Sequence, residues 1–120
     1  SDEQIRRLVE RDAVIGMACD AWMLHPGWAA GRTPRDVVPL DRIADHVDHV
    51  CQIAGDALHV GIGSDLDGGF GTEQTPRDLD RISDLQKLEA VFASRGYSEQ
   101  AIDDVFHGNW LRFFREHLPA

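Results

Sequence analysis

The segment HVGIGSDLDGG at residues 59–69 decides the fold that we expect for this chain. Its first half is a short apolar run spaced by glycines, which predicts a strand over residues 58–63. A loop with two carboxylates, Asp65 and Asp67, follows directly. In parallel α/β folds, functional groups gather at the carboxyl ends of the strands. Both carboxylates are therefore candidates for a functional site, although such a pair is also a common turn or helix-capping device.

Three familiar ligand-binding motifs do not fit this loop. A dinucleotide fingerprint needs G-x-G-x-x-G, but Leu66 stands at the position of the third glycine. A P-loop needs a Gly-Lys pair, and the only lysine of the chain is Lys87. A calcium loop beginning at Asp65 needs a glutamate at its last ligand position, which is Pro76. The loop belongs to none of these three classes.

A second apolar run, AVIGMAC at residues 13–19, predicts another strand, and Asp20 and Trp22 follow it directly. If the two strands are parallel, Asp20 and Asp65 lie at the same edge of the sheet. Both runs have the composition of strands that are buried on both faces. Two strands cannot bury each other in that way, so we expect the sheet to be incomplete in this chain.

Helical patterns separate and follow the two strands, which predicts an α/β fold with a parallel sheet. We read residues 23–39, with their prolines and glycines, as a long loop. Five helical segments are expected. The first is capped by Ser1 with Gln4. The second is capped by Asp41 and stopped by Gly55, with a buried stripe at Ile43, Val47 and Val50. The others are one over residues 78–94 with Ile82 inward, one capped by Ser98, and a last turn after a break at Gly108 and Asn109.

The composition restricts the class of partner. Lysine and arginine number 12 against 21 aspartates and glutamates, which gives a net charge of −9. Binding to nucleic acid through a basic face and docking on an anionic membrane are both disfavoured. No apolar run approaches the roughly 20 residues of a membrane span. Cys19 and Cys51 lie in apolar settings and are expected to be buried free thiols.

Other residue patterns give little support for a metal site or a nucleophile within this chain. His46 and Asp48 have the spacing of a metal-binding His-x-Asp, but they lie in an expected helix, where residues two apart point in nearly opposite directions. His46 and His49 share a face without an evident third ligand. No Ser/His/Asp or Cys/His arrangement can be defended. We therefore assign no metal ligand to this chain.

The chain resembles the membrane (renal) dipeptidase family, peptidase family M19. The segment DHVCQIAG at residues 48–55, followed by HVGIGSDLDGGFG at 59–71, carries the resemblance, and its most specific part is the G-x-G-S-D-x-D-G-G pattern. RGYS at residues 95–98 and GNWLR at 108–112 agree with it. Residues 14–24 resemble a bacterial branch of that family.

This resemblance implies a (β/α)8 barrel of TIM type, a metal-dependent hydrolase that cleaves dipeptides with two zinc ions. Such a barrel takes about 250 residues or more. Residues 1–120 match only its C-terminal part, namely strands seven and eight with their flanking helices, and are therefore expected to be incomplete as a fold. The resemblance also implies that the binuclear zinc ligands lie outside this chain, so that the isolated chain is inactive.

The resemblance implies roles for four residues. Asp65 matches the aspartate that takes a proton from the metal-activated water and passes it to the leaving amine. Asp67 supports the loop beside the substrate pocket, and Asp20 and Trp22 line the mouth of that pocket. The expected partners are a dipeptide substrate and the missing N-terminal part of the barrel, with a homodimer left open.

Two alternatives remain at this point. The chain could be a non-catalytic assembly fragment that completes a barrel with a partner chain. It could also be another class of α/β enzyme with a site at Asp20 and Asp65. The residues show no leader or lipid-anchor pattern. We therefore expect a soluble bacterial protein without direct membrane contact. Whether it lies in the cytoplasm or the periplasm stays open.

Overall fold

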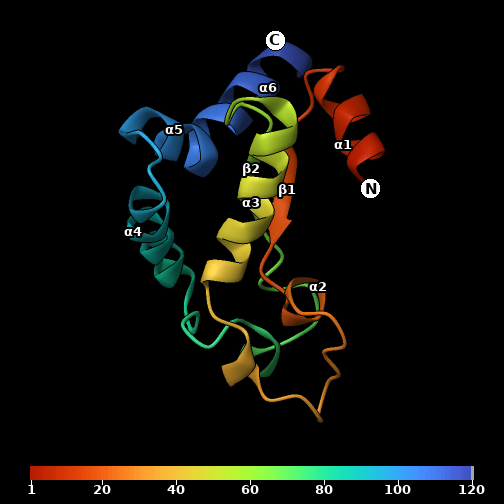
Figure 1. Ribbon diagram of the computed structural model, residues 1–120, viewed down its shortest axis with the longest axis vertical. Coiled ribbons are helices and arrows are strands. Elements are labelled where there is room, and N and C mark those ends of the chain that lie inside the picture. Colours follow the sequence, from red (N-terminus) through yellow and green to blue (C-terminus); the bar gives the residue numbers. More distant parts are fainter. Residues whose placement is uncertain (120) are drawn as a thin grey trace.

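The computed structural model describes residues 1–119, whose two strands form a parallel pair. The strands are β1 (Ile15–Ala18) and β2 (Val60–Ser64), so the expected parallel sheet is confirmed. The α-helices are, in chain order, α1 (Asp2–Val9), α2 (Ala21–Leu24), α3 (Asp41–Ala54), α4 (Lys87–Ser94), α5 (Glu99–Asp103) and α6 (Asn109–His117) (Figure 1). β1 begins later than the apolar run because the Ala13 N–H donates to the Leu8 carbonyl of α1 at 3.0 Å.

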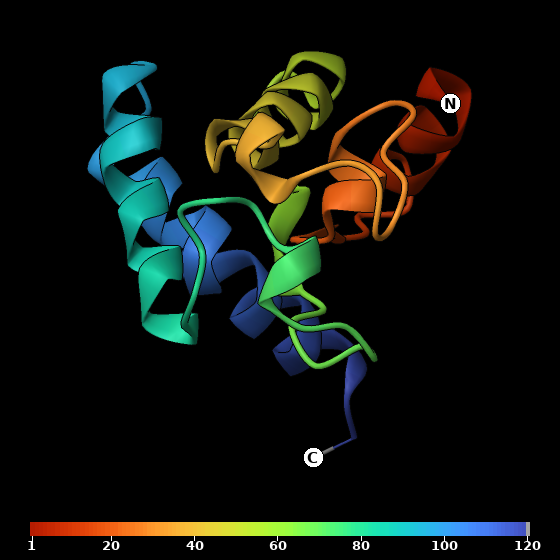
Figure 2. The same cartoon turned by 90° about the horizontal axis from the view of Figure 1, so that it is seen from below.

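One face of the sheet packs against α3, and the core lies between them. In the parallel register, Ile15 is opposite Val60 and Met17 is opposite Ile62. Successive side chains of a strand point to opposite faces, so these four share one face. Met17 and Val60 are buried there, and Ile15 and Ile62 pack against the same core cluster. Figure 2 shows α3 on this face of the sheet and α6 on the other.

The opposite face of the sheet consists of glycines, and α6 packs on it through a tryptophan. The indole of Trp110 lies so close to Gly61 that a β carbon at Gly61 would overlap it. The indole Nε1 donates to the Ile62 carbonyl at 3.1 Å, and the ring stacks on Phe114. Gly61 therefore lacks a side chain because the backbone and the indole must approach each other closely.

The expectation that both strands are buried on both faces is only partly met. Gly16 and Gly63 are exposed, because Trp110 covers the sheet mainly at Gly61. Within residues 1–119 each strand has a single strand partner, so the outer edge of each strand is unpaired. Unpaired edges present free backbone donors and acceptors, which other proteins cover or pair.

Helix α3 ends as expected and begins differently. Gly55 terminates it in the left-handed conformation, with φ of 85°, a conformation that glycine adopts without steric cost. Its N-cap is Leu40, and Asp41 lies inside the first turn, where a carboxylate interacts favourably with the helix dipole. Its buried stripe of Ile43, Val47 and Val50 is confirmed. No helix in residues 1–119 has the length and apolar character that crossing a bilayer requires.

The helix expected over residues 78–94 is shorter, and it starts with a 3-10 helix over Ile82–Gln86 that leads into α4. The carboxylate of Asp84 accepts hydrogen bonds from the backbone N–H groups of Asp80 and Arg81, at 3.0 and 2.9 Å. These bonds hold the preceding residues in a non-helical turn. Ile82, expected to face inward, is 73% exposed because it lies in this first turn.

The expected break at Gly108 and Asn109 is wrong, whereas the Ser98 cap is confirmed. Ser98 accepts from the Ala101 N–H at 3.2 Å, and a π-helix over Asp104–Gly108 joins α5 to α6. Asn109 is buried, and its amide donates to the carbonyls of Ala57 and Val60 at 2.7 and 2.8 Å. Because this amide is satisfied by β2 and the turn before it, it does not compete for its own helical backbone.

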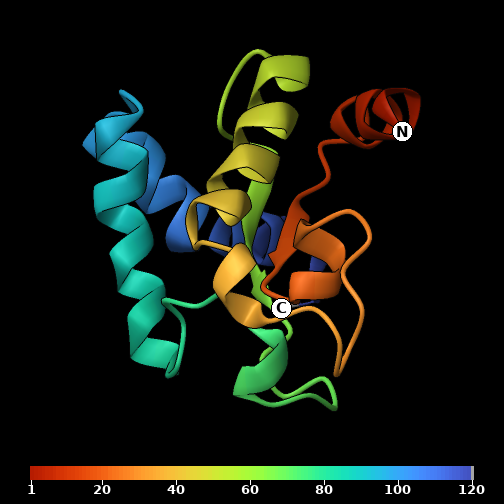
Figure 3. The ribbon, with the colours of Figure 1, turned by 60° about the horizontal axis from the view of Figure 1, so that its bottom comes forward.

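The long loop expected at residues 23–39 contains part of α2 and a 3-10 helix over Arg35–Val37. It lies beside the segment that follows β2 (Figure 3). The Arg35 guanidinium donates to the Pro76 carbonyl at 2.5 Å and pairs with Asp80 at 2.6 Å, and the Arg77 N–H donates to the Val38 carbonyl at 3.0 Å. The last residues of the first segment, residues 35–38, are therefore joined by hydrogen bonds to residues 76–80 of the second.

Candidate functional site

Both strands end at the same edge of the sheet, and the loops that follow them meet there (Figure 1). Ala18 pairs with Ser64 across a register shift, and the Cys19 N–H donates to the Ser64 carbonyl at 2.8 Å. Asp20 directly follows Cys19 in sequence, and Asp65 directly follows Ser64. The structure therefore brings the two aspartates to one rim of the sheet, as the parallel arrangement predicts.

Asp65 is exposed, and its backbone adopts an uncommon conformation. Ser64 and Asp65 have φ values of 52° and 61°, a left-handed region that residues other than glycine seldom adopt. Strained backbone of this kind gathers at functional sites, where the surrounding structure holds it. The Gly68 N–H donates to the Asp65 carbonyl at 3.0 Å, and the Asp65 carboxylate occupies the space that a Gly68 side chain would fill.

Asp20 is buried, with 6% of its surface exposed, and its carboxylate has two donors. Its Oδ1 accepts from the Trp22 N–H at 2.9 Å, which caps α2, and from the Gln74 side-chain amide at 2.8 Å. A buried carboxylate is costly unless hydrogen bonds compensate it. Asp20 thus fastens the loop after β1 to the loop after β2.

Trp22 and Asp67 face solvent at the same rim. Trp22 is 63% exposed on α2, although large aromatic side chains are usually more covered. Asp67 is exposed in the loop that carries Asp65. The indole and the carboxylates of Asp65 and Asp67 are therefore accessible to a ligand at this rim.

Sequence reasoning did not identify Gln74 or Arg35. Gln74 lies in a 3-10 helix over Thr72–Gln74, and its contact with Asp20 joins residues 54 positions apart. A single glutamine or arginine in an irregular segment carries no periodicity that could indicate such a contact. The only sequence signal was the expected convergence of the two loops at one edge.

The thiol of Cys19 is close to the candidate site but is not a nucleophile. Burial, and then the negative charge of Asp65, raise the pKa of the Cys19 thiol to about 12. The group is therefore a neutral thiol at physiological pH, whereas the nucleophilic form is the thiolate. Cys19 and Cys51 are both free thiols, as expected. Cys19 is buried as expected, but Cys51 is only half-buried.

Of the His-x-Asp pattern in α3, Asp48 belongs to an ionic network of the fold. Asp48 accepts from Arg95 at 2.5 Å and from the Tyr97 hydroxyl at 2.6 Å. His46 is exposed, and the side chains of His46 and Asp48 do not converge. Residues 1–119 contain no group of three or more His, Cys, Asp or Glu side chains that could hold a metal ion. The described residues by themselves therefore do not fit a metal centre.

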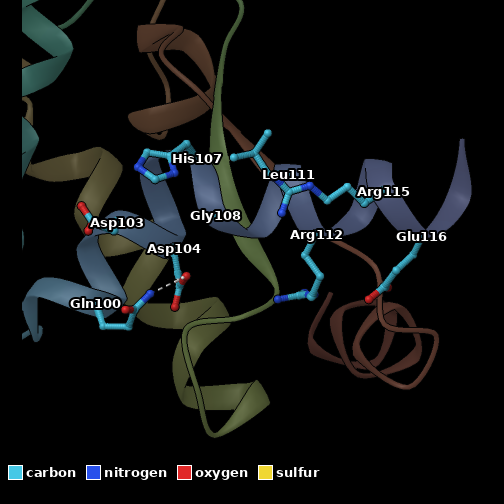
Figure 4. Close-up of a pocket in the computed structure, with 9 residues that line it drawn as sticks. All are labelled: Gln100, Asp103, Asp104, His107, Gly108, Leu111, Arg112, Arg115 and Glu116. Atoms are coloured by element: carbon cyan, nitrogen blue, oxygen red, sulfur yellow. Dashed lines mark hydrogen bonds between the residues drawn. The ribbon is translucent and has the colours of Figure 1, made fainter.

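A groove of about 350 Å³ runs along α5 and α6, away from the rim (Figure 4). Its lining mixes both charge signs and includes Asp103, Glu116 and Arg115. Gln100 donates to Asp104 there at 3.1 Å, across one helical turn. Charged side chains of both signs with such local pairs are typical of a solvated helix surface, and we assign no role to this groove.

Comparison with known proteins agrees with the resemblance seen in the sequence. The profile of the membrane dipeptidase family, peptidase family M19, matches residues 1–118. Human dipeptidase 3 is 36% identical over 74 residues, which are 62% of this chain and 14% of that protein. An uncharacterized dipeptidase of Schizosaccharomyces pombe is 29% identical over 114 residues, which are 95% of this chain and 25% of that protein.

A solved structure extends the similarity to the fold. The crystal structure of dipeptidase AC, a metallopeptidase of family M19, superimposes with a TM-score of 0.81 at 25% sequence identity. The superposition covers 99% of this chain and 32% of that one. This chain spans less than a third of the length of each relative that it matches here. It belongs to the membrane dipeptidase family, peptidase family M19.

Proposed function

We propose that this chain forms the last two βα units of a (β/α)8 barrel, the C-terminal part of a single catalytic domain. The parallel pairing of β1 and β2 supports this proposal, as do their unpaired outer edges within residues 1–119. A whole barrel has eight such strands. The share of 32% that the chain covers in its structural neighbour is also consistent with a part of a barrel.

The whole protein, in this proposal, hydrolyses the peptide bond of dipeptides and uses two zinc ions. The dipeptidases that the chain resembles support the reaction and the substrate class. Since residues 1–119 hold no cluster that fits a metal, the zinc ligands are assigned to the part of the barrel outside this chain. The contribution of this chain to the reaction rests on its own side chains.

Asp65 carries out the proton transfer in the proposed reaction. Its carboxylate accepts a proton from the attacking water as the water oxygen bonds to the peptide carbon. It then donates that proton to the amine nitrogen as the C–N bond breaks, and so returns to its ionised form. The observation that carries this role is the exposed Asp65 carboxylate at the carboxyl end of β2, in a chain of the M19 family.

The other rim residues contribute to the substrate pocket. Trp22 supplies an exposed apolar surface on α2 at the mouth of the pocket. Asp67 supports that loop from the solvent side. Asp20 belongs to the same rim, with its carboxylate turned to the hydrogen bonds that hold the two loops.

The test of this function is the substitution Asp65→Asn in the longest protein that contains this chain. The amide preserves size but cannot accept the proton, so dipeptide turnover is expected to fall by about 10²–10⁴-fold. Asp36→Asn, at an exposed aspartate in the Arg35–Val37 helix, is the matched control and should leave turnover unchanged. Unchanged turnover in Asp65→Asn removes Asp65 from this role.

A further inference from the structure

The hydrogen bond between Asp20 and Gln74 joins the loop after β1 to the loop after β2, which carries Asp65. Asp20 stands two residues after β1, and Gln74 stands ten residues after β2 in sequence order. Their contact of 2.8 Å therefore spans the gap between the two loops at the carboxyl edge of the sheet. The same Asp20 oxygen caps α2, the helix that presents Trp22.

The hydrogen bond between Gln74 and Asp20 is stabilised by the charge and the burial of its acceptor. An ionised acceptor shortens and strengthens a hydrogen bond relative to a neutral pair. Asp20 is 6% exposed, so water cannot readily replace the amide of Gln74. Without that amide, the buried carboxylate would keep only the Trp22 N–H as a described donor, and the loss of a partner from a buried charged group is costly.

The segment between Asp65 and Gln74 is fixed at both of its ends. At the first end, the Cys19 N–H donates to the Ser64 carbonyl at 2.8 Å. At the second end, Gln74 is bound to Asp20. Ser64 and Asp65, at the first end, keep left-handed backbone angles, which persist only where the surrounding structure holds them. The second end is therefore expected to restrain the orientation of Asp65.

We propose that Gln74 and Asp20 form a positioning pair, in which Gln74 holds the loop of Asp65 at a set distance from α2 and Trp22. The inference rests on the proposed function, because it gives the pair its task of orienting the proton-transferring carboxylate. Gln74 acts through Asp65 and does not touch the reacting atoms. Arg35, which binds the Pro76 carbonyl, fastens the next part of the same segment.

The test compares Gln74→Leu in two backgrounds of the longest protein that contains this chain. Leucine keeps the volume and removes the donor. With Asp65 present, kcat/KM for a dipeptide is expected to fall about tenfold, because small misplacements of a catalytic group are costly. In the Asp65→Asn background, the residual rate of dipeptide turnover is measured at high enzyme concentration. There, the same substitution is expected to change that rate less than twofold.

The matched control is Gln100→Leu, which removes a Gln-to-Asp hydrogen bond of 3.1 Å on α5 and should not change kcat/KM (Figure 4). Gln74→Asn, whose shorter side chain also loses the contact, replaces Gln74→Leu if that variant does not fold. Wild-type kcat/KM in the Gln74 variant overturns the proposal. An equal loss in both backgrounds also overturns it, because Gln74 would then support only the fold. Full turnover in Asp65→Asn alone rejects the proposed function instead.

Discussion

At the scale of single residues, the candidate site depends on backbone shape as much as on side-chain chemistry. Asp65 follows a strand and adopts a left-handed backbone conformation, although its side chain makes that conformation less favourable than it is for glycine. Its carboxylate occupies the space beside Gly68. The sequence predicted the identity of Asp65 as a candidate, since a carboxylate after a buried strand is a recognisable pattern. The strain and the close approach to Gly68 follow only from the three-dimensional path of the loop.

Gly68→Ala tests whether this space matters. The added methyl group would overlap the Asp65 carboxylate and force it to move. Dipeptide turnover by the longest protein that contains this chain is expected to fall about tenfold, as a misplaced catalytic group would cause. Gly71→Ala is the control in the same loop, because its methyl group meets only the exposed end of Glu73. Equal activity of the two variants would contradict this use of Gly68.

At the scale of elements, patterns local in sequence were the most predictable. The Ser1, Gly55 and Ser98 signals mark helix ends where expected. The errors at residues 78–94 and at Gly108 and Asn109 share a cause. In both places a polar side chain bonds to backbone groups that sequence periodicity does not reveal. The Asp84 carboxylate accepts from the N–H groups of Asp80 and Arg81, and the Asn109 amide donates to the carbonyls of Ala57 and Val60. The Asp84 bonds are local, three and four residues apart, whereas the Asn109 bonds join residues about 50 positions apart.

The Asp84 turn predicts a pH dependence of stability. The hydrogen bond from Lys87, and then those from the backbone of Asp80 and Arg81, lower the pKa of the Asp84 carboxyl from 3.8 to about 2. A lowered folded-state pKa stabilises the fold above the unfolded-state pKa, and this stabilisation is lost as the pH falls through the folded-state value. The turn should therefore weaken between about pH 4 and pH 2.

Urea unfolding of the longest protein that contains this chain, as wild type and as Asp84→Ala, measures this effect. The difference in the free energy of unfolding between them should be constant above about pH 5 and should shrink toward about pH 2. Glu89→Ala, at an exposed acid of α4, controls for the general loss of negative charge. A difference that stays constant down to about pH 2 would show that the Asp84 carboxylate does not stabilise the turn in its ionised form.

At the scale of the whole molecule, the sheet has the features expected of the proposed part of a barrel. Within residues 1–119 the sheet has two strands, one face packed on α3 and a glycine face that Trp110 covers only in part. Residues 1–120 expressed alone are therefore expected to be molten, oligomeric or prone to aggregation, because the unpaired strand edges pair with other chains.

Near-ultraviolet circular dichroism and sedimentation of the isolated chain check this expectation. Weak tertiary signals or associated species are the expected result. A monomer with a sharp two-state thermal transition would contradict it. The longest protein that contains this chain serves as the control, since its strands would have neighbours on both sides.

The sequence by itself determined the α/β class, the parallel strand pair, the family and the candidate role of Asp65. These features depend on local patterns and on a contiguous motif, both of which are readable along the chain. Only the tertiary structure decided that Asp20 is buried, that Gln74 binds it from 54 positions away, and that Trp110 packs on a glycine face. Such contacts depend on how distant segments meet in space. Single residues in irregular segments show no sequence periodicity from which their partners could be predicted.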